Sequence, residues 1–444
     1  MAVTRHKTKQ AVTKYRTKKL ECWGKAKALR EKYYKDFAEA KGKGGIRWAG
    51  GAWQIDSIPM GLGDDVYNLT SEPYGASVGH DPAFAVKCQE AAEAKGFARD
   101  LCSYMRNEWG SVLLNKYYFG GDWPKPDFYF QNHICCSHAK WYQVMRDLEG
   151  GDIPYFCVDV SVGPNDIIDE DKLDYVAGQY LDAIDWMQKV TGRKYDDEKL
   201  IKAVHNECRS TALWAEICAL NQTVPAPLDE KSMYSLYVLG TLHKAGREIA
   251  DFYQELRDEV KDRVANQIAA VPNERLRIMT DSQPPWSALS LFRYLEDFGV
   301  VTVGSLYTFS LIGIWDVAPD GKLVPARTPE QQGIVLKNRE DAVRFIVKWN
   351  LKKLMWEPFY DARLRAKRVV QIAKQWKVNG MMMHLNLGCE GTTIGNLESR
   401  LALLKEGIPV LTYEGNMGDD RQYDEVGTQK RVDIWMKSFG LERE

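Results

Sequence analysis

The chain has 444 residues, of which 45% are hydrophobic, and its 60 basic and 61 acidic side chains leave a formal net charge of -1. This length predicts more than one folded domain. The near-zero charge argues against a nucleic-acid binder, and no apolar run reaches the roughly 20 residues of a membrane-spanning helix. The nine cysteines are irregularly spaced, which argues against a disulfide framework. We therefore expect a cytoplasmic protein that binds neither nucleic acid nor membrane.

The chain begins with a segment rich in Lys, Arg, Glu and Ala. Within it "LREKYYKDFAEA" has the spacing of a helix, and "GKGGIRWAGGAWQ" then interrupts the pattern. We expect residues 1–45 to form a basic helical extension. Its charged face is either exposed to solvent or lies against a partner subunit or an anionic ligand.

Two later stretches share one pattern, although about 250 residues separate them. They are "DFYFQNHICCSHAKWYQVMRDLEGGDIPYFCVDV" from Asp127 and "NGMMMHLNLGCEGTTIGNLESRLALLKEGIPVLTYEG" from Asn379. Each reads as an apolar strand, a cysteine, an amphipathic helix, a turn with Gly and Ile-Pro, and a second apolar strand. This order is typical of a β-α-β unit with parallel strands. The sequence therefore predicts an α/β protein with two related halves.

The rest of the chain fits around these units. We expect a first α/β domain over 46–194, a helical segment over 195–271 and a second α/β domain over 272–444. In the second domain, residues 275–281 and 300–308 are apolar enough to be further strands on either side of a helix.

Cysteines stand at corresponding points of the two halves. Cys135 and Cys389 each follow a strand and precede a helix. Ligands of open α/β sheets gather at the carboxyl ends of the strands, and helix N-termini favour thiolates. Cys102 in "GFARDLCSYMRNEWG" could complete a set of three, although a single cysteine is usually a buried small hydrophobe. Three thiolates can hold a cubane iron–sulfur cluster and leave one iron without a protein ligand.

Other site chemistries remain open at this point. A zinc site with three cysteines could use His133 or His384, but His384 lies five residues before Cys389 on a strand, so the two side chains should point to opposite faces. Neither a P-loop motif nor a GxGxxG between a strand and a helix is present in the sequence. If the reaction uses ATP, another subunit must bind it.

Three segments carry a family resemblance. "DLCSYMRNEWG", "NHICCSHAKWY" and "LNLGCEGTTIGNLESRLALLKEGIPVLTYEGNMGDDRQYDEVGTQKRVDIW" resemble the 2-hydroxyacyl-CoA dehydratase and benzoyl-CoA reductase family, with the likeness running from about Trp48 to the end. "WAGGAWQIDSIPMGLGDDVYNLTSEPYGASVGHD" and the basic first helix are most similar to the larger cluster-bearing subunit of ATP-dependent, class I benzoyl-CoA reductase.

The resemblance implies a fold, a cofactor and a site. It implies two Rossmann-like or flavodoxin-like domains and a 4Fe-4S cluster, or a larger double-cubane cluster, held between them by Cys102, Cys135 and Cys389. Many members have Asp after the strand-end cysteine, where this chain has Cys136, so Cys136 is an alternative ligand.

The resemblance also implies an activity with its partners. The chain would be the iron–sulfur subunit of a benzoyl-CoA reductase, an oxidoreductase that reduces an aromatic acyl-CoA to a cyclic dienoyl-CoA with electrons from ferredoxin. Its partners would be a homologous cluster-bearing subunit and two ATPase subunits that activate the electrons. The alternative is a subunit of a radical 2-hydroxyacyl-CoA dehydratase.

Ring reduction requires a proton donor near the cluster. We expect Glu72 or His80 in "SEPYGASVGHD", or His133 beside Cys135, to serve. The competing interpretation is structural for each of them: a helix-capping carboxylate for Glu72 and hydrogen-bonded histidines for the other two. Arg106 could equally do no more than pair with Glu108 or another acid.

Overall fold

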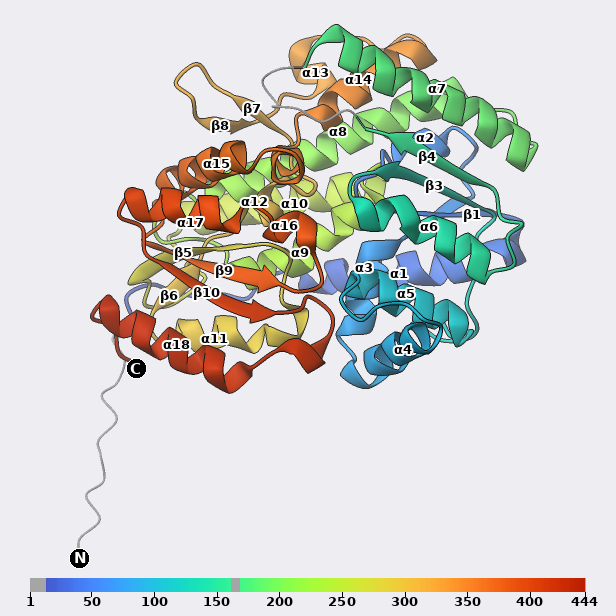
Figure 1. Cartoon of the computed structure of the whole chain (residues 1–444). Coiled ribbons are helices and arrows are strands. Elements are labelled where there is room, and N and C mark those ends of the chain that lie inside the picture. Colours follow the sequence, from blue (N-terminus) through green and yellow to red (C-terminus); the bar gives the residue numbers. More distant parts are fainter. Residues whose placement is uncertain (1–12, 161–167, 444) are drawn as a thin grey trace, which may run out of the picture.

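A computed structural model describes residues 13–160 and 168–443 of the chain (Figure 1). Its first sheet has the strand order β2-β1-β3-β4, and every neighbouring pair is parallel. The strands are β1 (Ile46–Gly50), β2 (Val66–Thr70), β3 (Phe128–His133) and β4 (Tyr155–Asp159). Their buried faces carry near-continuous apolar runs, as expected for a parallel sheet covered on both sides.

The second sheet repeats this design with the order β10-β9-β5-β6, again all parallel. Its strands are β5 (Leu276–Asp281), β6 (Val300–Thr302), β9 (Gly380–Asn386) and β10 (Val410–Gly415). The prediction of an α/β fold with two parallel sheets is confirmed. The domain boundaries given above stay a prediction.

The strand expected over 300–308 was wrong in its second half. β6 ends at Thr302, and Gly304 then takes a left-handed φ of 132°. The Ser305 side chain accepts a hydrogen bond from the Thr308 N–H and so begins the short helix α12 (Leu306–Ser310). A serine N-cap therefore overrides the β-branched pattern that precedes it.

Helices cover the faces of both sheets. Around the first sheet lie α2 (Ser57–Met60), α3 (Ser71–Gly79), α4 (Pro82–Ala94), α5 (Ser103–Leu113) and α6 (Cys136–Leu148). Around the second lie α11 (Ser290–Glu296), α15 (Ala362–Gln375), α16 (Glu390–Thr393), α17 (Asn396–Lys405) and α18 (Glu425–Ser438). Although they follow β6 in the chain, α13 (Pro329–Gln332) and α14 (Arg339–Leu351) lie on the side of the first sheet, and Ile346 of α14 shares a buried cluster with Trp48 and Phe130. A small hairpin, β7 (Trp315–Val317) and β8 (Leu323–Pro325), is antiparallel.

Four long helices connect the halves: α7 (Glu170–Thr191), α8 (Asp197–Leu220), α9 (Glu230–His243) and α10 (Arg247–Ala265). In Figure 1 the two sheets lie on the right and left, and α9 and α10 are seen between them. One hydrophobic core runs through both halves, since Leu69, Tyr234 and Met381 belong to the same buried cluster. The sheets are therefore packed into one body through the helical segment.

Of the basic extension predicted over 1–45, residues 1–12 lie outside the described part of the chain, and the rest contains α1 (Trp23–Glu39). This helix packs on α9 and α10, and it buries Phe37 and Tyr34, whose ring stacks on that of Phe119. Its outer lysines meet acids of α10, for example Lys25 with Glu255 at 2.5 Å. Part of its positive charge is thus balanced within the chain. Across the described ranges, none of the helices combines the length and the low polarity that crossing a membrane requires.

Candidate functional site

Three cysteines occupy equivalent backbone positions at the ends of helices. Cys102, Cys135 and Cys389 are the N-cap residues of α5, α6 and α16. Each has non-helical backbone dihedral angles, and backbone N–H groups in the first turns of α5 and α6 act on the sulfurs of Cys102 and Cys135. Cys135 follows β3 and Cys389 follows β9, both at the carboxyl ends of parallel strands. All three thiols thus stand at the start of a helix, two of them at the edge of a parallel sheet where ligands gather.

The three thiols lie near enough to influence one another's pKa. Burial is the main reason that the pKa of Cys102 is raised, and the neighbouring Cys389 and Cys135 sulfurs raise it further. Burial and Cys389 likewise raise the pKa of Cys135 to about 12, against the opposing effect of the His138 and Ser137 N–H groups. Three sulfurs from distant parts of the sequence thus act on one another electrostatically, which is costly for thiolates without a bound cation.

The structure distinguishes the adjacent cysteines Cys135 and Cys136. Cys135 is partly buried and its pKa is influenced by Cys389, whereas Cys136 is exposed in the first turn of α6. Cys389 has a further partner, because the Gln283 amide Nε2 donates to its Sγ at 2.9 Å. This geometry favours Cys135 over Cys136 as the third member of the set.

Three thiols are, by their chemistry, a donor set that an iron–sulfur cluster can use, with a different iron at each cysteine. In the part of the chain that the structure describes, no group of three or more His, Cys, Asp and Glu side chains is arranged to hold a metal ion. Neither histidine considered for zinc joins the sulfurs: His133 is exposed beside Asp159, and His384 is buried against the Tyr413 ring.

A carboxylate and a histidine lie beside the thiols. Glu72, in the first turn of α3, accepts a hydrogen bond from the Ala52 N–H at 2.8 Å. Its Oε1 lies 2.7 Å from Nε2 of His138, a buried residue whose own N–H faces Cys135. Gly51 permits this contact, since a Cβ there would come within 2.5 Å of the His138 ring. Sequence reasoning found Glu72 but missed His138, although its place three residues after Cys135 was a usable signal.

The two other predicted proton donors lie elsewhere. His80 is an exposed residue at the C-terminus of α3, with its ring 5.0 Å from that of Trp286. His133 is exposed and pairs with Asp159 at 3.3 Å. Neither histidine contacts Glu72 in the described structure, so the three predicted proton donors do not form one site.

A narrow cavity opens beside Glu72. Its lining is mostly aromatic and apolar: Ala52, Pro73, Ala76, Tyr104, Tyr237, Val238, Trp286, Tyr307 and Leu311, with Thr241. The free space is only about 10 Å³, so an acyl group enters only if side chains of the wall move. Glu72 is the one charged residue of the lining.

Two further buried groups lie behind the site. Arg106 does not pair with Glu108; it forms ion pairs with Glu93 and with Asp419, each at 3.2 Å. Glu108 instead accepts hydrogen bonds from Ser71 at 3.0 Å and Trp141 at 2.6 Å. Burial raises the pKa of Glu108 to about 8, so this carboxyl is protonated at neutral pH.

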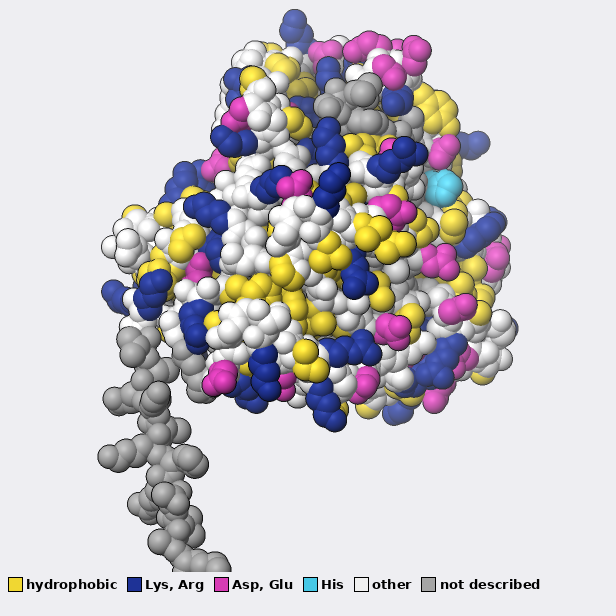
Figure 2. Space-filling model, turned by 60° about the vertical axis from the view of Figure 1, so that its left-hand side comes forward, with side chains coloured by type: hydrophobic (Ala, Val, Ile, Leu, Met, Phe, Trp, Pro, Cys, Tyr) yellow, Lys and Arg dark blue, Asp and Glu magenta, His cyan; other side chains and the backbone are white. Residues whose placement is uncertain are grey.

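The surface near Cys389 is unusually apolar. Leu397, Leu401 and Leu404 are spaced along α17 and are 63%, 58% and 46% exposed. Figure 2, in which the left-hand side of Figure 1 comes forward, shows hydrophobic side chains gathered in the middle of this face with Lys and Arg around them. Such a patch is typical of surfaces that contact other proteins.

Comparison with known proteins gives one family. The model of the 2-hydroxyglutaryl-CoA dehydratase D-component matches residues 74–436. The (R)-2-hydroxyisocaproyl-CoA dehydratase alpha subunit of Clostridioides difficile is 25% identical over 86% of this chain and 88% of its own length. The (R)-phenyllactyl-CoA dehydratase alpha subunit of Clostridium sporogenes is 24% identical over 77% and 78%, respectively. The lactoyl-CoA dehydratase alpha subunit of Anaerotignum propionicum is 23% identical over 89% and 91%.

Proposed function

Because the chain belongs to the 2-hydroxyglutaryl-CoA dehydratase D-component family, we propose that it is the cluster-bearing subunit of an enzyme that removes water from a 2-hydroxyacyl-CoA. The observation that carries this proposal is the meeting of three N-cap thiols in a chain similar to dehydratase alpha subunits over most of its length. The family likeness was expected from the sequence. The dehydratase alternative now has more support than the reductase that the sequence put first.

Cys102, Cys135 and Cys389 would hold the cluster. When bound, a 4Fe-4S cluster supplies single electrons to the acyl group. The chain's own contribution is to orient three sulfurs with helix N-termini, to donate the Gln283 N–H to Cys389, and to keep water away by burying Cys102 and Cys135. Partner subunits complete the assembly, since the relatives are alpha subunits by name.

Loss of water from a 2-hydroxyacyl group requires a base that takes a proton from the substrate. Glu72 fits this role, because its carboxylate lines the cavity next to the thiols. His138 holds that carboxylate through the 2.7 Å contact and has a second ring nitrogen, Nδ1, without a hydrogen-bond partner in the described part of the chain. Oε1 of Glu72 likewise has no hydrogen-bond partner in the described part of the chain, so it is the carboxylate atom that can accept the proton.

Ring reduction of an aromatic acyl-CoA is the second candidate, and the aromatic lining of the cavity favours it. Tyr104, Tyr237, Trp286 and Tyr307 surround the space next to Glu72, where a flat ring would find offset and edge-on aromatic neighbours. This candidate brings with it the ferredoxin donor and the ATPase subunits named above, and Glu72 would then act as a proton donor.

Electron counting separates the two candidates. The chain, purified anaerobically with its partner subunits, is supplied with a reductant and either a 2-hydroxyacyl-CoA or an aromatic acyl-CoA. A dehydratase forms enoyl-CoA in large excess over the reductant consumed, because the reaction is redox-neutral. A reductase consumes reductant in proportion to the dienoyl-CoA formed. An iron-free, colourless preparation would contradict both candidates.

A further inference from the structure

A short loop after β10, residues 416–419, lies between two of the three cysteine turns. We call it the clamp loop. On one side it packs against α4 and α5: the Gln89 side chain of α4 donates to the Gly418 carbonyl at 2.7 Å and to Asn107 of α5 at 2.8 Å. A Cβ on Gly418 would lie 3.2 Å from the Ser103 hydroxyl, which shows how closely the loop approaches the start of α5.

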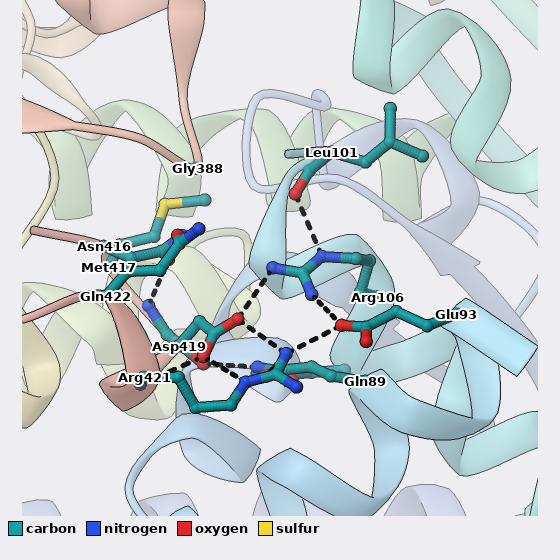
Figure 3. A network of polar contacts seen from close by, with 12 residues as sticks. Gln89, Glu93, Leu101, Arg106, Gly388, Asn416, Met417, Asp419, Arg421 and Gln422 are labelled. Atoms are coloured by element: carbon teal, nitrogen blue, oxygen red, sulfur yellow. Dashed lines mark hydrogen bonds and ion pairs between the residues drawn. The ribbon is translucent and has the colours of Figure 1, made fainter. Parts of the chain in front are cut away.

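A buried ion pair secures this side of the loop (Figure 3). The guanidinium of Arg106 reaches Asp419 at 3.2 Å, and both side chains are fully buried. The same guanidinium donates from Nε to the carbonyl of Leu101 at 3.1 Å, the residue before Cys102. Arg106 therefore joins the backbone beside Cys102 to the clamp loop of the other half.

Glu93 and Arg421 complete the charge balance. Glu93 lies 3.2 Å from Arg106 and 2.7 Å from Arg421, and Arg421 also contacts Asp419 at 2.8 Å. The pKa of Asp419 lies below its ordinary value because the two arginines outweigh the effect of burial. The network holds two cations and two anions, so every buried charge has an opposite neighbour.

The other side of the clamp loop touches the turn that carries Cys389. The Asn386 side-chain oxygen accepts from the Met417 N–H at 3.2 Å and from the Gly388 N–H at 3.1 Å. The Asn386 carbonyl accepts from the Cys389 N–H at 3.2 Å. Gly388 also packs on Asn416, since a Cβ at Gly388 would lie 2.8 Å from the amide. Contacts thus run without a break from Leu101 to Cys389.

We propose that the clamp loop sets the spacing between the Cys102 and Cys389 sulfurs, and that Arg106 is the positioning residue that fixes it. The two cysteines come from different halves, and in the described structure Arg106 contacts both the Cys102 backbone and the loop. The proposal rests on the proposed function only in that the spacing serves a shared cluster.

The test measures the spacing directly, on the iron-free, reduced full-length chain. Dibromobimane, which becomes fluorescent when it links two thiols, is added, and mass spectrometry compares the Cys102–Cys389 link with the Cys102–Cys135 link. The second link lies within the first half and does not cross the loop. Arg106→Lys and Asp419→Asn should lower the ratio of the two links about fivefold, because each change leaves a buried charge without its partner.

Two variants keep this test decisive. Gly418→Ala adds one methyl group against Ser103 and should lower the ratio of the two links. Because it leaves the ion pair intact, this variant should fold even if Arg106→Lys and Asp419→Asn fail to fold. Arg277→Lys is the matched control. Arg277 is a buried arginine paired with Glu274 at 2.6 Å, and it lies at the start of β5, at the end of the sheet away from the cysteines. Arg277→Lys should leave the ratio unchanged.

Iron content is the second measurement. After anaerobic reconstitution, the clamp-loop variants should retain less iron than Arg277→Lys at equal folded fraction. An unchanged link ratio in folded Arg106→Lys and Gly418→Ala chains would overturn the proposal, as would an equal loss in Arg277→Lys. If the wild type binds no iron, the proposed function fails, but the link ratio still tests the clamp loop.

Discussion

The β3-α6-β4 unit of the first half and the β9-α16-α17-β10 unit of the second half each hold a cysteine at the end of a strand, but they do so with different local structures. In the first unit, Cys135 caps an uninterrupted helix that buries His138, Trp141, Tyr142 and Met145. In the second unit, Cys389 caps a single turn, α16, and the chain breaks at Gly395, with a φ of 84°, before α17 begins.

The two cysteines are consequently held by different forces. Cys135 depends on the packing of α6 and on backbone N–H groups. Cys389 depends on side chains: Gln283 donates to its sulfur and also accepts a hydrogen bond from the Thr392 hydroxyl at 2.6 Å. A shared sequence pattern thus produces one rigid site and one site fixed by a polar network. The loss of a single polar group should therefore matter more in the second half.

The largest effect should follow removal of a thiol. Cys135→Ser should lose bound iron and at least about 100-fold of activity, because it removes one of the three sulfurs proposed to hold the cluster. Cys136→Ser should stay within about twofold, since its side chain is exposed. Iron analysis and turnover of the anaerobic complex check both variants. The reverse result would place the ligand one residue later and remove the equivalence of the two halves.

Truncating the buried face of α6 should cost stability. Met145 is fully buried, so Met145→Ala should lower the free energy of unfolding by about 2–5 kcal/mol. Leu401→Ala on α17 removes an apolar side chain that is 58% exposed and should change it by less than about 0.5 kcal/mol. Chemical denaturation of the isolated chain measures both. Similar losses of unfolding free energy in the two variants would show that Leu401 of α17 stabilises the fold as much as Met145 of α6.

The polar network around Cys389 can be tested at Gln283. Gln283→Leu should destabilise the fold by about 1–3 kcal/mol by leaving buried partners unsatisfied, and should also reduce iron retention. Gln131→Leu is a matched control, because Gln131 also donates to a cysteine sulfur, that of Cys157, at a distance of 3.3 Å. Cys157 is not one of the three proposed ligands. Gln131→Leu should affect stability alone. Equal iron retention in both variants would contradict a role for Gln283 at the sulfur.

The last comparison of the two halves concerns pH. Glu108 of the first half is buried without a cation, whereas Asp281 of the second half pairs with Arg365. Because the folded chain keeps the Glu108 proton up to a pKa of about 8 and the unfolded chain releases it near 4.5, this residue's stabilisation is lost as the pH rises between these values. The loss is at most about 1.4 kcal/mol per pH unit.

Glu108→Gln should abolish this contribution. The difference in unfolding free energy between wild type and Glu108→Gln, measured from pH 5 to pH 9, should therefore change with pH. A constant difference over that range would show that Glu108 is ionised throughout.

The sequence determined the two β-α-β units and the cysteines that begin their helices. Strand and helix periodicity, glycine turns and the apolar run "GMMMHLN" are local properties, and β9 forms over those residues. Local patterns failed where a cap competed with a strand, as at Ser305. They also gave no sign that Gly395 would split the second helix.

The tertiary structure alone decided which residues meet. It brought Cys102 from a separate helix to the other two sulfurs, placed His138 against Glu72, and turned His80 and His133 toward the surface. It also paired Arg106 with Asp419, 313 positions later in the chain. Such contacts depend on how sheets and helices pack across the whole core, and the periodicity of a single segment carries no information about that packing.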